Sequence, residues 1–210
     1  MWTVEELKSL DRKTRKLLTI HGVFHPRNDI DRLHVPRKRG GRGLIGCEDC
    51  VRAEENNVTW YIKNAVEALL LEMRRSGMIK TEDCKEKKQY KRVKVTETIS
   101  RWTKKTMYGQ FHRDVEERID QEKRWLWLAK SDLKPETEAL ICAAQEQALR
   151  TNYIKHRVDH TAESDRCRVC GDNGETVWHI TSQCTPLAQR EYKRRHDNVA
   201  RRVHWMLYGK

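Results

Sequence analysis

Residues 167–184 read CRVCGDNGETVWHITSQC. Cysteine and histidine recur in this stretch as C-x2-C-x8-H-x4-C, at Cys167, Cys170, His179 and Cys184. Two thiolates separated by two residues can bind one ion from a single tight turn, and a histidine with a third thiolate completes a tetrahedral shell. Because protein atoms fill all four positions, the pattern predicts one structural Zn²⁺ ion and no metal-bound water. Since the stretch contains few apolar residues, metal binding is expected to drive its folding.

Other residues compete for metal. His160 and His196 are near enough in sequence to replace the fourth ligand, and His196 is the stronger rival because a following helix could return it to the ion. Cys47 and Cys50 form another C-x2-C pair, but no further ligand pair lies nearby. We expect them to be ordinary thiols at the start of a helix, with a second metal site as the alternative.

A strongly basic helix is expected after the cysteines. Pro186 suits the first turn of a helix, which should continue to about Leu207. Its apolar stripe consists of Leu187, Val199, Val203 and Leu207. Its cationic residues, which we expect to contact the phosphates of RNA or DNA, are Arg190, Lys193, Arg194, Arg195, Arg201 and Arg202.

A second basic segment lies between residues 21 and 46, where prolines and glycines prevent a continuous helix. The sequence predicts a loop or hairpin in which guanidinium groups and exposed backbone amides meet phosphates. Its expected nucleic-acid-binding residues are Arg37, Lys38, Arg39 and Arg42.

The remaining chain predicts a mainly α fold. Residues 1–78 should form a helical region that contains the basic loop, with helices over 3–20 and 48–75, the first capped by Thr3 and Glu6. Residues 79–97 are so rich in charge that they read as a linker or a fully solvated helix. Residues 98–160 should form a helical linker domain that ends in a helix over 138–158, and residues 161–210 the zinc unit with its basic helix.

Composition points to a polyanionic partner. Lys and Arg outnumber Asp and Glu by 43 to 31, which gives a formal net charge of +12. The first twenty residues lack the apolar core of a secretion signal, and no stretch is apolar enough to span a membrane. The cysteine count of 7 is odd and does not suggest a disulfide framework, so we expect an intracellular protein.

Motifs for catalysis are missing from the sequence. It contains no Walker loop, no G-x-G-x-x-G, no H-E-x-x-H and no G-x-S-x-G. Asp29 and Asp31 could in principle hold Mg²⁺, but carboxylates in a polar loop followed by Arg32 more often form salt bridges or caps. We therefore expect no enzyme activity from this chain alone.

Three ordered segments resemble a known family. They are LDRKTRKLLTIHGVFHPRNDIDRLHVPRKRGGRGLI (10–45), ETEALICAAQEQALRTNYIKHRVD (136–159), and the cysteine–histidine pattern followed by LAQREYKRRHDNVARRVHW (187–205). Together they are similar to the C-terminal part of LINE-type, non-LTR retrotransposon reverse transcriptases, of the kind that carries a restriction-enzyme-like endonuclease. The resemblance implies a thumb-like region, a helical linker and a CCHC zinc knuckle, in that order, and a nuclear location.

The sequence also departs from that family. No Y-x-D-D motif is present, so the carboxylates of a polymerase are missing, and the endonuclease that would follow the knuckle is missing as well. The expected function is that of a noncatalytic fragment of a retrotransposon reverse transcriptase that binds template RNA or target DNA. The alternative is a zinc-stabilised helical module whose partner is a protein, such as the catalytic parts of the same polyprotein.

Overall fold

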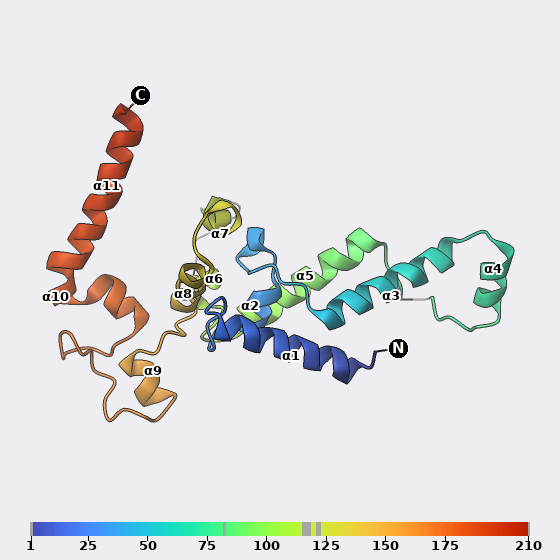
Figure 1. Ribbon diagram of the computed structural model, residues 1–210, viewed down its shortest axis with the longest axis horizontal. Coiled ribbons are helices and arrows are strands. Elements are labelled where there is room, and N and C mark those ends of the chain that lie inside the picture. The colour runs from blue at the N-terminus through green and yellow to red at the C-terminus, as the bar shows by residue number, and fades with distance from the viewer. Residues whose placement is uncertain (1, 82, 115–118, 121–122, 210) are drawn as a thin grey trace. The chain divides into compact units, whose positions relative to one another are not determined.

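The computed structural model describes residues 2–81, 83–114, 119–120 and 123–209. This part of the chain is mainly helical and contains no strand, only an isolated β-bridge between Arg166 and Gly174. The predicted mainly α fold is therefore confirmed for the described residues. The chain divides into two compact units, Met1–Cys142 and Ala143–Lys210 (Figure 1).

The first unit contains most of the helices. They are α1 (Val4–Ile20), α2 (Ile30–His34), α3 (Cys47–Asn64), α4 (Ala68–Arg75), α5 (Lys87–Thr103), α6 (Gln110–Arg113) and α7 (Leu126–Lys130). A further helix, α8 (Pro135–Gln145), crosses the boundary between the units. The helices expected between residues 98 and 160 include residues 115–118 and 121–122, which lie outside the described part of the chain.

Helix α1 begins as the sequence predicts. The backbone N–H of Glu6 donates to the Thr3 hydroxyl over 3.3 Å, and the Glu6 carboxylate accepts from the Thr3 backbone over 2.7 Å. This reciprocal capping box satisfies two N–H groups that no helical carbonyl can reach. The helix buries Leu7 and packs on α3.

The single helix predicted over 48–75 is wrong, because the structure breaks it between α3 and α4. Ala65 is extended, with φ −70° and ψ 146°, and the side chain of Arg74 donates to the carbonyl of Lys63. That hydrogen bond satisfies a carbonyl that a continuing helix would have used. Val66 and Leu69 are 85% and 73% exposed, so no packing favours continuation of the helix.

The basic segment over 21–46 is folded tightly around Arg32 rather than forming an open loop. Arg32 is 2% exposed and donates from Nε to the Gly40 carbonyl at 2.9 Å and from Nη1 to the Cys142 carbonyl at 3.0 Å. Its guanidinium also lies 5.3 Å from the ring centroid of Trp102. Since both glycine-rich backbone and tryptophan contact this cation, Arg32 organises the core of the first unit.

Helix α5 begins within the segment 79–97, so the structure gives part of that segment a helix. Tyr90, Val93 and Val95 are half-buried, which means that this helix is not fully solvated as one alternative expected. The helix packs on α2 and α3 and buries Trp102.

The second unit begins with the end of α8, followed by α9 (Asn152–Arg157), so the predicted unbroken helix over 138–158 is wrong. Gln147 takes a left-handed φ of 55°, which ends the first helix, and the Thr151 side chain caps the second. After the cysteines, α10 (Thr185–Leu187), the π-helical turn η4 (Ala188–Tyr192) and α11 (Lys193–Tyr208) follow without interruption. The helix predicted from Pro186 to Leu207 is thus confirmed.

No helix in the described ranges is both long enough and apolar enough to cross a bilayer.

Candidate metal centre

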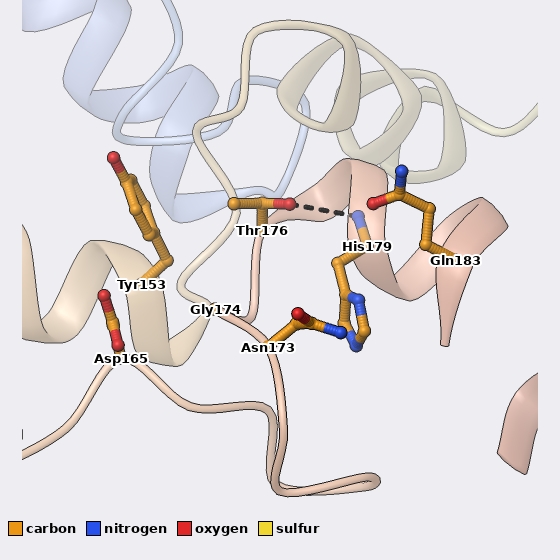
Figure 2. Close-up of a pocket in the computed structure, with 7 residues that line it drawn as sticks. All are labelled: Tyr153, Asp165, Asn173, Gly174, Thr176, His179 and Gln183. Carbon is orange, nitrogen blue, oxygen red and sulfur yellow. Dashed lines mark hydrogen bonds between the residues drawn. The ribbon is translucent and has the colours of Figure 1, made fainter. Parts of the chain in front are cut away.

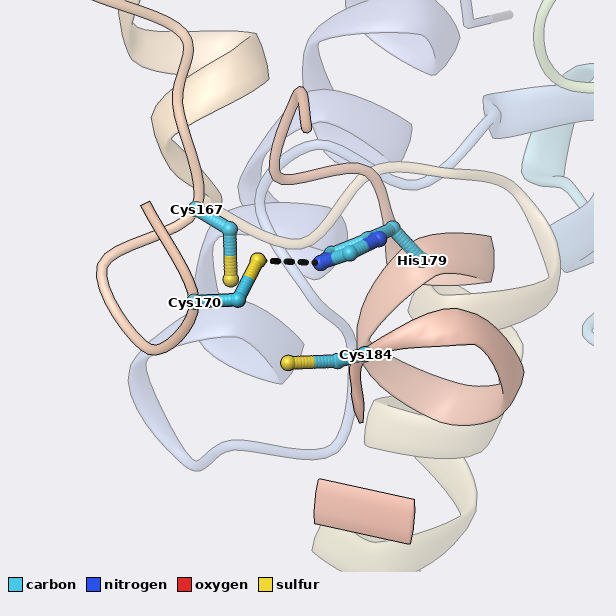
Figure 3. A group of neighbouring side chains, drawn as sticks. All are labelled: Cys167, Cys170, His179 and Cys184. Atoms are coloured by element: carbon cyan, nitrogen blue, oxygen red, sulfur yellow. Dashed lines mark hydrogen bonds between the residues drawn. The ribbon is translucent and has the colours of Figure 1, made fainter. Parts of the chain in front are cut away.

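The four predicted ligands meet in space. One potential ligand atom from each of Cys167, Cys170, His179 and Cys184 lies within 4.8 Å of all the others. The Sγ of Cys170 is 3.3 Å from Nε2 of His179 (Figure 3). Cys184, Cys167 and His179 are buried, with 0%, 2% and 2% exposure. We call these four residues the cysteine–histidine cluster.

The first two cysteines are positioned by a tight backbone turn. The N–H of Cys167 donates to the carbonyl of Asn173 at 2.7 Å, and the N–H of Gly171 donates to the carbonyl of Cys167 at 2.8 Å. Gly171 has φ +76°, a left-handed conformation that glycine adopts without a steric penalty. The turn therefore brings both thiols to the same side of the chain.

The last two ligands come from a π-helical turn, η3 (His179–Gln183), which begins at His179 and is followed at once by Cys184. The N–H of Cys184 donates to the carbonyl of His179 at 2.9 Å. The Tyr192 hydroxyl accepts from the Cys184 N–H at 3.1 Å and donates to the Ile180 carbonyl at 2.7 Å. Nothing in the sequence pattern marked Tyr192 as part of this centre.

Glu175 is a second residue that sequence reasoning missed. It is 0% exposed, and its carboxylate accepts from the backbone N–H groups of Arg168 and Asn152, both at 2.9 Å. The Arg168 guanidinium adds hydrogen bonds of 2.6 to 3.1 Å. Burial raises the pKa of Glu175, but these donors lower it more, to about 2. Glu175 thus ties the cysteine turn to the start of α9.

The electrostatics of the cluster differ from one thiol to another, because burial and the neighbouring Cys167 raise the pKa of Cys184 whereas the pKa of Cys170 is lowered. Backbone N–H groups of Asn173 and Asp172 lower the pKa of the Cys170 thiol to about 6. A thiolate is the form of cysteine that binds metal. A tetrahedral ion with bonds of about 2.3 Å to sulfur separates its sulfur ligands by roughly 3.8 Å, so a small contraction of the cluster would complete a coordination shell. The residues therefore fit a metal ion with four protein ligands.

The rival ligands lie elsewhere. His160 and His196 do not join the cluster; His196 is exposed, and its Nδ1 is 3.2 Å from Oδ1 of Asp197. Cys47 and Cys50 lie in the first turn of α3, where the Cys47 N–H donates to the Asp11 carboxylate at 2.8 Å. Among the residues that the structure describes, they belong to no group that could hold an ion.

Asp29 and Asp31 form ion pairs and a cap, in agreement with the favoured interpretation. The Nζ of Lys105 lies 2.5 Å from Asp29 and 2.9 Å from Asp31, while Arg101 contacts Asp31 at 2.6 Å. The Asp29 side chain also accepts from the Asp31 N–H at 2.9 Å, at the start of α2. Because cations already fill these positions, the carboxylates do not form a magnesium site in this structure.

The basic loop separates into inner and outer cations. Arg37 and Arg42 both bind Glu138, Arg42 at 3.3 Å with its side chain 8% exposed. Lys38 and Arg39 are exposed. The single negative charge of Glu138 offsets one of the two positive charges of Arg37 and Arg42 and holds both side chains. Because Lys38 and Arg39 form no ion pair with a described residue, they are better placed to meet a phosphate.

The cations of the C-terminal segment are all exposed. This holds for Arg190, Lys193, Arg194, Arg195, Arg201 and Arg202. One of them, Arg194, forms an ion pair with Glu191 at 2.7 Å, and the Arg195 guanidinium lies 5.3 Å from the ring centroid of Tyr192. Arg194 and Arg201 lie about two turns apart on one side of α11, as do Arg195 and Arg202. This helix thus presents a cationic surface.

Comparison of the chain with protein-family models, with curated proteins and with solved structures gives no match.

Proposed function

We propose that this protein binds nucleic acid through the exposed cations of α11, with a structural zinc ion holding the cysteine–histidine cluster from which the helix emerges. The observation that carries the proposal is the exposure of every cationic residue from Arg190 to Arg202. Cations on a solvated helix can release the counterions condensed on a polyanion, which favours binding to phosphates. Lys38 and Arg39 supply further exposed charge on the first unit.

Zinc is the metal proposed for the cluster. Three thiols and one imidazole nitrogen form the ligand set of closed structural zinc sites. Harder cations such as Mg²⁺ and Ca²⁺ prefer oxygen ligands, which the cluster does not offer. Four protein ligands leave no open position, so the ion would stabilise the second unit rather than activate water.

The proposed role is noncatalytic. The three segments that resemble a non-LTR retrotransposon reverse transcriptase support the interpretation as a thumb-like, linker and knuckle fragment of such a polyprotein, which acts in the nucleus. The Y-x-D-D motif of a polymerase does not occur in this sequence. Sequencing of the genomic DNA around the reading frame tests this origin, which requires palm coding sequence upstream and endonuclease coding sequence downstream.

Salt dependence tests nucleic-acid binding. Affinity for single-stranded RNA and duplex DNA should fall steeply with salt, and each lost phosphate contact should reduce the slope of log K against log salt by about 0.7 to 0.9. The test variant carries Arg→Glu substitutions at Arg194, Arg195, Arg201 and Arg202, all exposed.

A matched control carries the same charge change on the first unit. Its substitutions to Glu are at Lys85, Lys88, Lys91 and Arg92, which are also exposed. Binding should collapse in the α11 variant and largely persist in the control. Equal losses would mean that net charge, and not α11, governs binding, and no binding by the unchanged protein at low salt would refute the proposal.

A protein-interaction module is the second candidate. Val199, Val203 and Leu207 on α11 are 61%, 50% and 70% exposed, and an apolar stripe of this kind is typical of helices that dock on a partner. A protein contact through this stripe should survive charge reversal of the arginines, which distinguishes it from nucleic-acid binding.

A further inference from the structure

An open surface pocket of about 740 Å³, which we call the cavity, lies beside the cysteine–histidine cluster, within the second unit. The side chains that line it are Tyr153, Asp165, Asn173, Thr176, His179 and Gln183. Figure 2 shows Tyr153 and Asp165 on one side, with Asn173, His179 and Gln183 on the other. Its volume lies within the range of sites that bind small organic groups, roughly 300 to 1,000 Å³.

The wall of the cavity is polar but carries no uncompensated charge. Its one ionisable carboxylate, Asp165, is paired with Arg157, whose Nε and Nη2 lie 3.0 Å and 2.9 Å from it. Asn173 and Gln183 each carry a side-chain amide, whose NH₂ group donates hydrogen bonds and whose carbonyl oxygen accepts them. A neutral group with its own donors and acceptors therefore suits the cavity better than a phosphate does.

Tyr153 adds a surface for stacking. Its side chain is 39% exposed, and it lies beside Gly174, where an added Cβ would be 3.6 Å from the tyrosine ring. A carbon at that distance is in ordinary van der Waals contact, so the backbone of Gly174 leaves room for at least one further atom beside the ring. Aromatic rings at the wall of a polar site are typical of sites that hold unpaired bases.

His179 also lies at the wall of the cavity. Its Nε2 faces Cys170, and its Nδ1 is buried without a hydrogen-bond partner. A histidine that binds metal through Nε2 carries its proton on Nδ1, and that N–H normally donates to a carbonyl, a carboxylate or water. Because this Nδ1 is closed to solvent, His179 lines the cavity only with its other atoms.

We propose that this cavity binds one unpaired nucleobase of a single strand. The base stacks on Tyr153 and forms hydrogen bonds with Asn173 and Gln183, while its phosphates contact the exposed Arg166, which follows the lining residue Asp165 in sequence. The inference rests on the proposed nucleic-acid binding and makes it more specific, because it predicts a preference for single strands over duplexes.

The test compares three probes on the full zinc-loaded protein. They are a single strand of roughly ten nucleotides, the same strand with abasic positions throughout, and a duplex of that strand. The two single-stranded probes carry equal numbers of phosphates. Loss of one stacked base should weaken binding by roughly tenfold. We therefore expect the intact strand to bind about ten times more tightly than the abasic strand, and the duplex to bind more weakly than the intact strand when affinities are compared per phosphate.

Variants locate the contact. Tyr153→Ala should remove most of the difference between intact and abasic strands, whereas Tyr153→Phe, which keeps the ring, should retain it. Asn173→Ala and Gln183→Ala should each also reduce the difference in affinity between intact and abasic strands. Metal content and circular dichroism check that each variant is folded, and the abasic comparison on the unchanged protein needs no variant at all.

The outcomes separate this inference from the proposed function. If intact and abasic strands bind equally and with steep salt dependence, nucleic-acid binding stands and the base site is refuted. If no probe binds at low salt, both are refuted. If Tyr153→Ala leaves the preference for intact strands unchanged, bases are bound elsewhere and the cavity assignment is wrong.

Discussion

The phenolic oxygen of Tyr192 lies 3.1 Å from the backbone nitrogen of Cys184, from which it accepts a hydrogen bond. It also donates to the carbonyl of Ile180 at 2.7 Å. Tyr192 ends the π-helical turn η4, directly before α11 begins at Lys193. One side chain therefore joins the turn that bears two of the cluster's ligands to the segment that leads into the basic helix.

Removal of this hydroxyl should loosen the centre. Tyr192→Phe leaves the N–H of Cys184 and the carbonyl of Ile180 without this partner, which should lower the free energy of unfolding by about 1 to 3 kcal/mol. Chemical denaturation and chelator competition measure the change in stability and in metal affinity. The control is Tyr208→Phe, since Tyr208 is 74% exposed and should change stability by less than about 0.5 kcal/mol. Equal effects of the two substitutions would contradict this role for Tyr192.

Cys170→Ser should abolish binding of one metal ion per chain. Without the Cys170 thiolate only three of the four protein ligands remain. Because metal binding drives folding of this segment, the helical structure of the second unit should decrease when the ion is lost. Metal analysis and circular dichroism measure both effects. Cys50→Ser is the matched control, because Cys50 is exposed and lies outside the cluster. An unchanged metal content in the Cys170 variant would show that the assignment is wrong.

The two histidines should behave differently. His179→Ala should release the ion, whereas His196→Ala should leave the metal content unchanged, since His196 is exposed and beside Asp197. Metal analysis under a graded concentration of chelator measures the difference in affinity, and loss of a direct ligand should lower the affinity by more than the roughly 10- to 100-fold that loss of an outer-shell partner costs. Loss of metal from the His196 variant would identify it as a ligand after all.

Gly41→Ala should destabilise the first unit severely. A Cβ at this position would lie 2.0 Å from the carbonyl oxygen of Val35, so the backbone would have to move. We expect a loss of about 3 kcal/mol or more in the free energy of unfolding, measured with denaturant. Gly46→Ala is the control, since its Cβ would have no neighbour closer than 3.4 Å and should cost about 1 kcal/mol or less.

The Asp31 carboxylate should make the stability of the first unit depend on pH. Burial raises the pKa of Asp31, but hydrogen bonds from Arg101 and Lys105 lower it more, so it falls below the usual 3.8. A carboxylate whose pKa is lower in the folded state stabilises the fold above the unfolded pKa and loses that effect as the pH falls through the folded value. The contribution of Asp31 is therefore full at neutral pH and disappears in strong acid.

Asp31→Asn measures that contribution. Relative to the unchanged protein it should lower the free energy of unfolding by about 1 to 3 kcal/mol near pH 7, and the difference should shrink below about pH 4. Unfolding of the variant and of the unchanged protein with denaturant at each pH gives the difference in their free energies of unfolding. Both proteins lose metal at low pH, so that effect cancels in the difference. The exposed Asp83→Asn serves as control. A difference independent of pH would mean that the charge of Asp31 is not responsible.

The local features of this protein were determined by the sequence itself. The ligands of the cluster lie within residues 167–184, so their spacing alone limits how far apart they can be. The capping box of Thr3 and Glu6 likewise depends only on a separation of three residues. Such contacts form within one or two turns of the chain, where stereochemistry permits few alternatives.

The distribution of the cations was decided by the tertiary structure alone. Sequence reasoning placed Arg37 and Arg42 with Lys38 and Arg39 on one phosphate-binding loop, but Glu138 lies about one hundred residues further on and pairs with the first two. In the same way Arg32 is enclosed by the carbonyls of Gly40 and Cys142, which lie 8 and 110 residues away in the sequence, and by Trp102, about seventy residues away. A charged side chain is buried only where other groups compensate for its loss of hydration. Those groups can lie far away in the sequence, so the residues around the charge do not predict them.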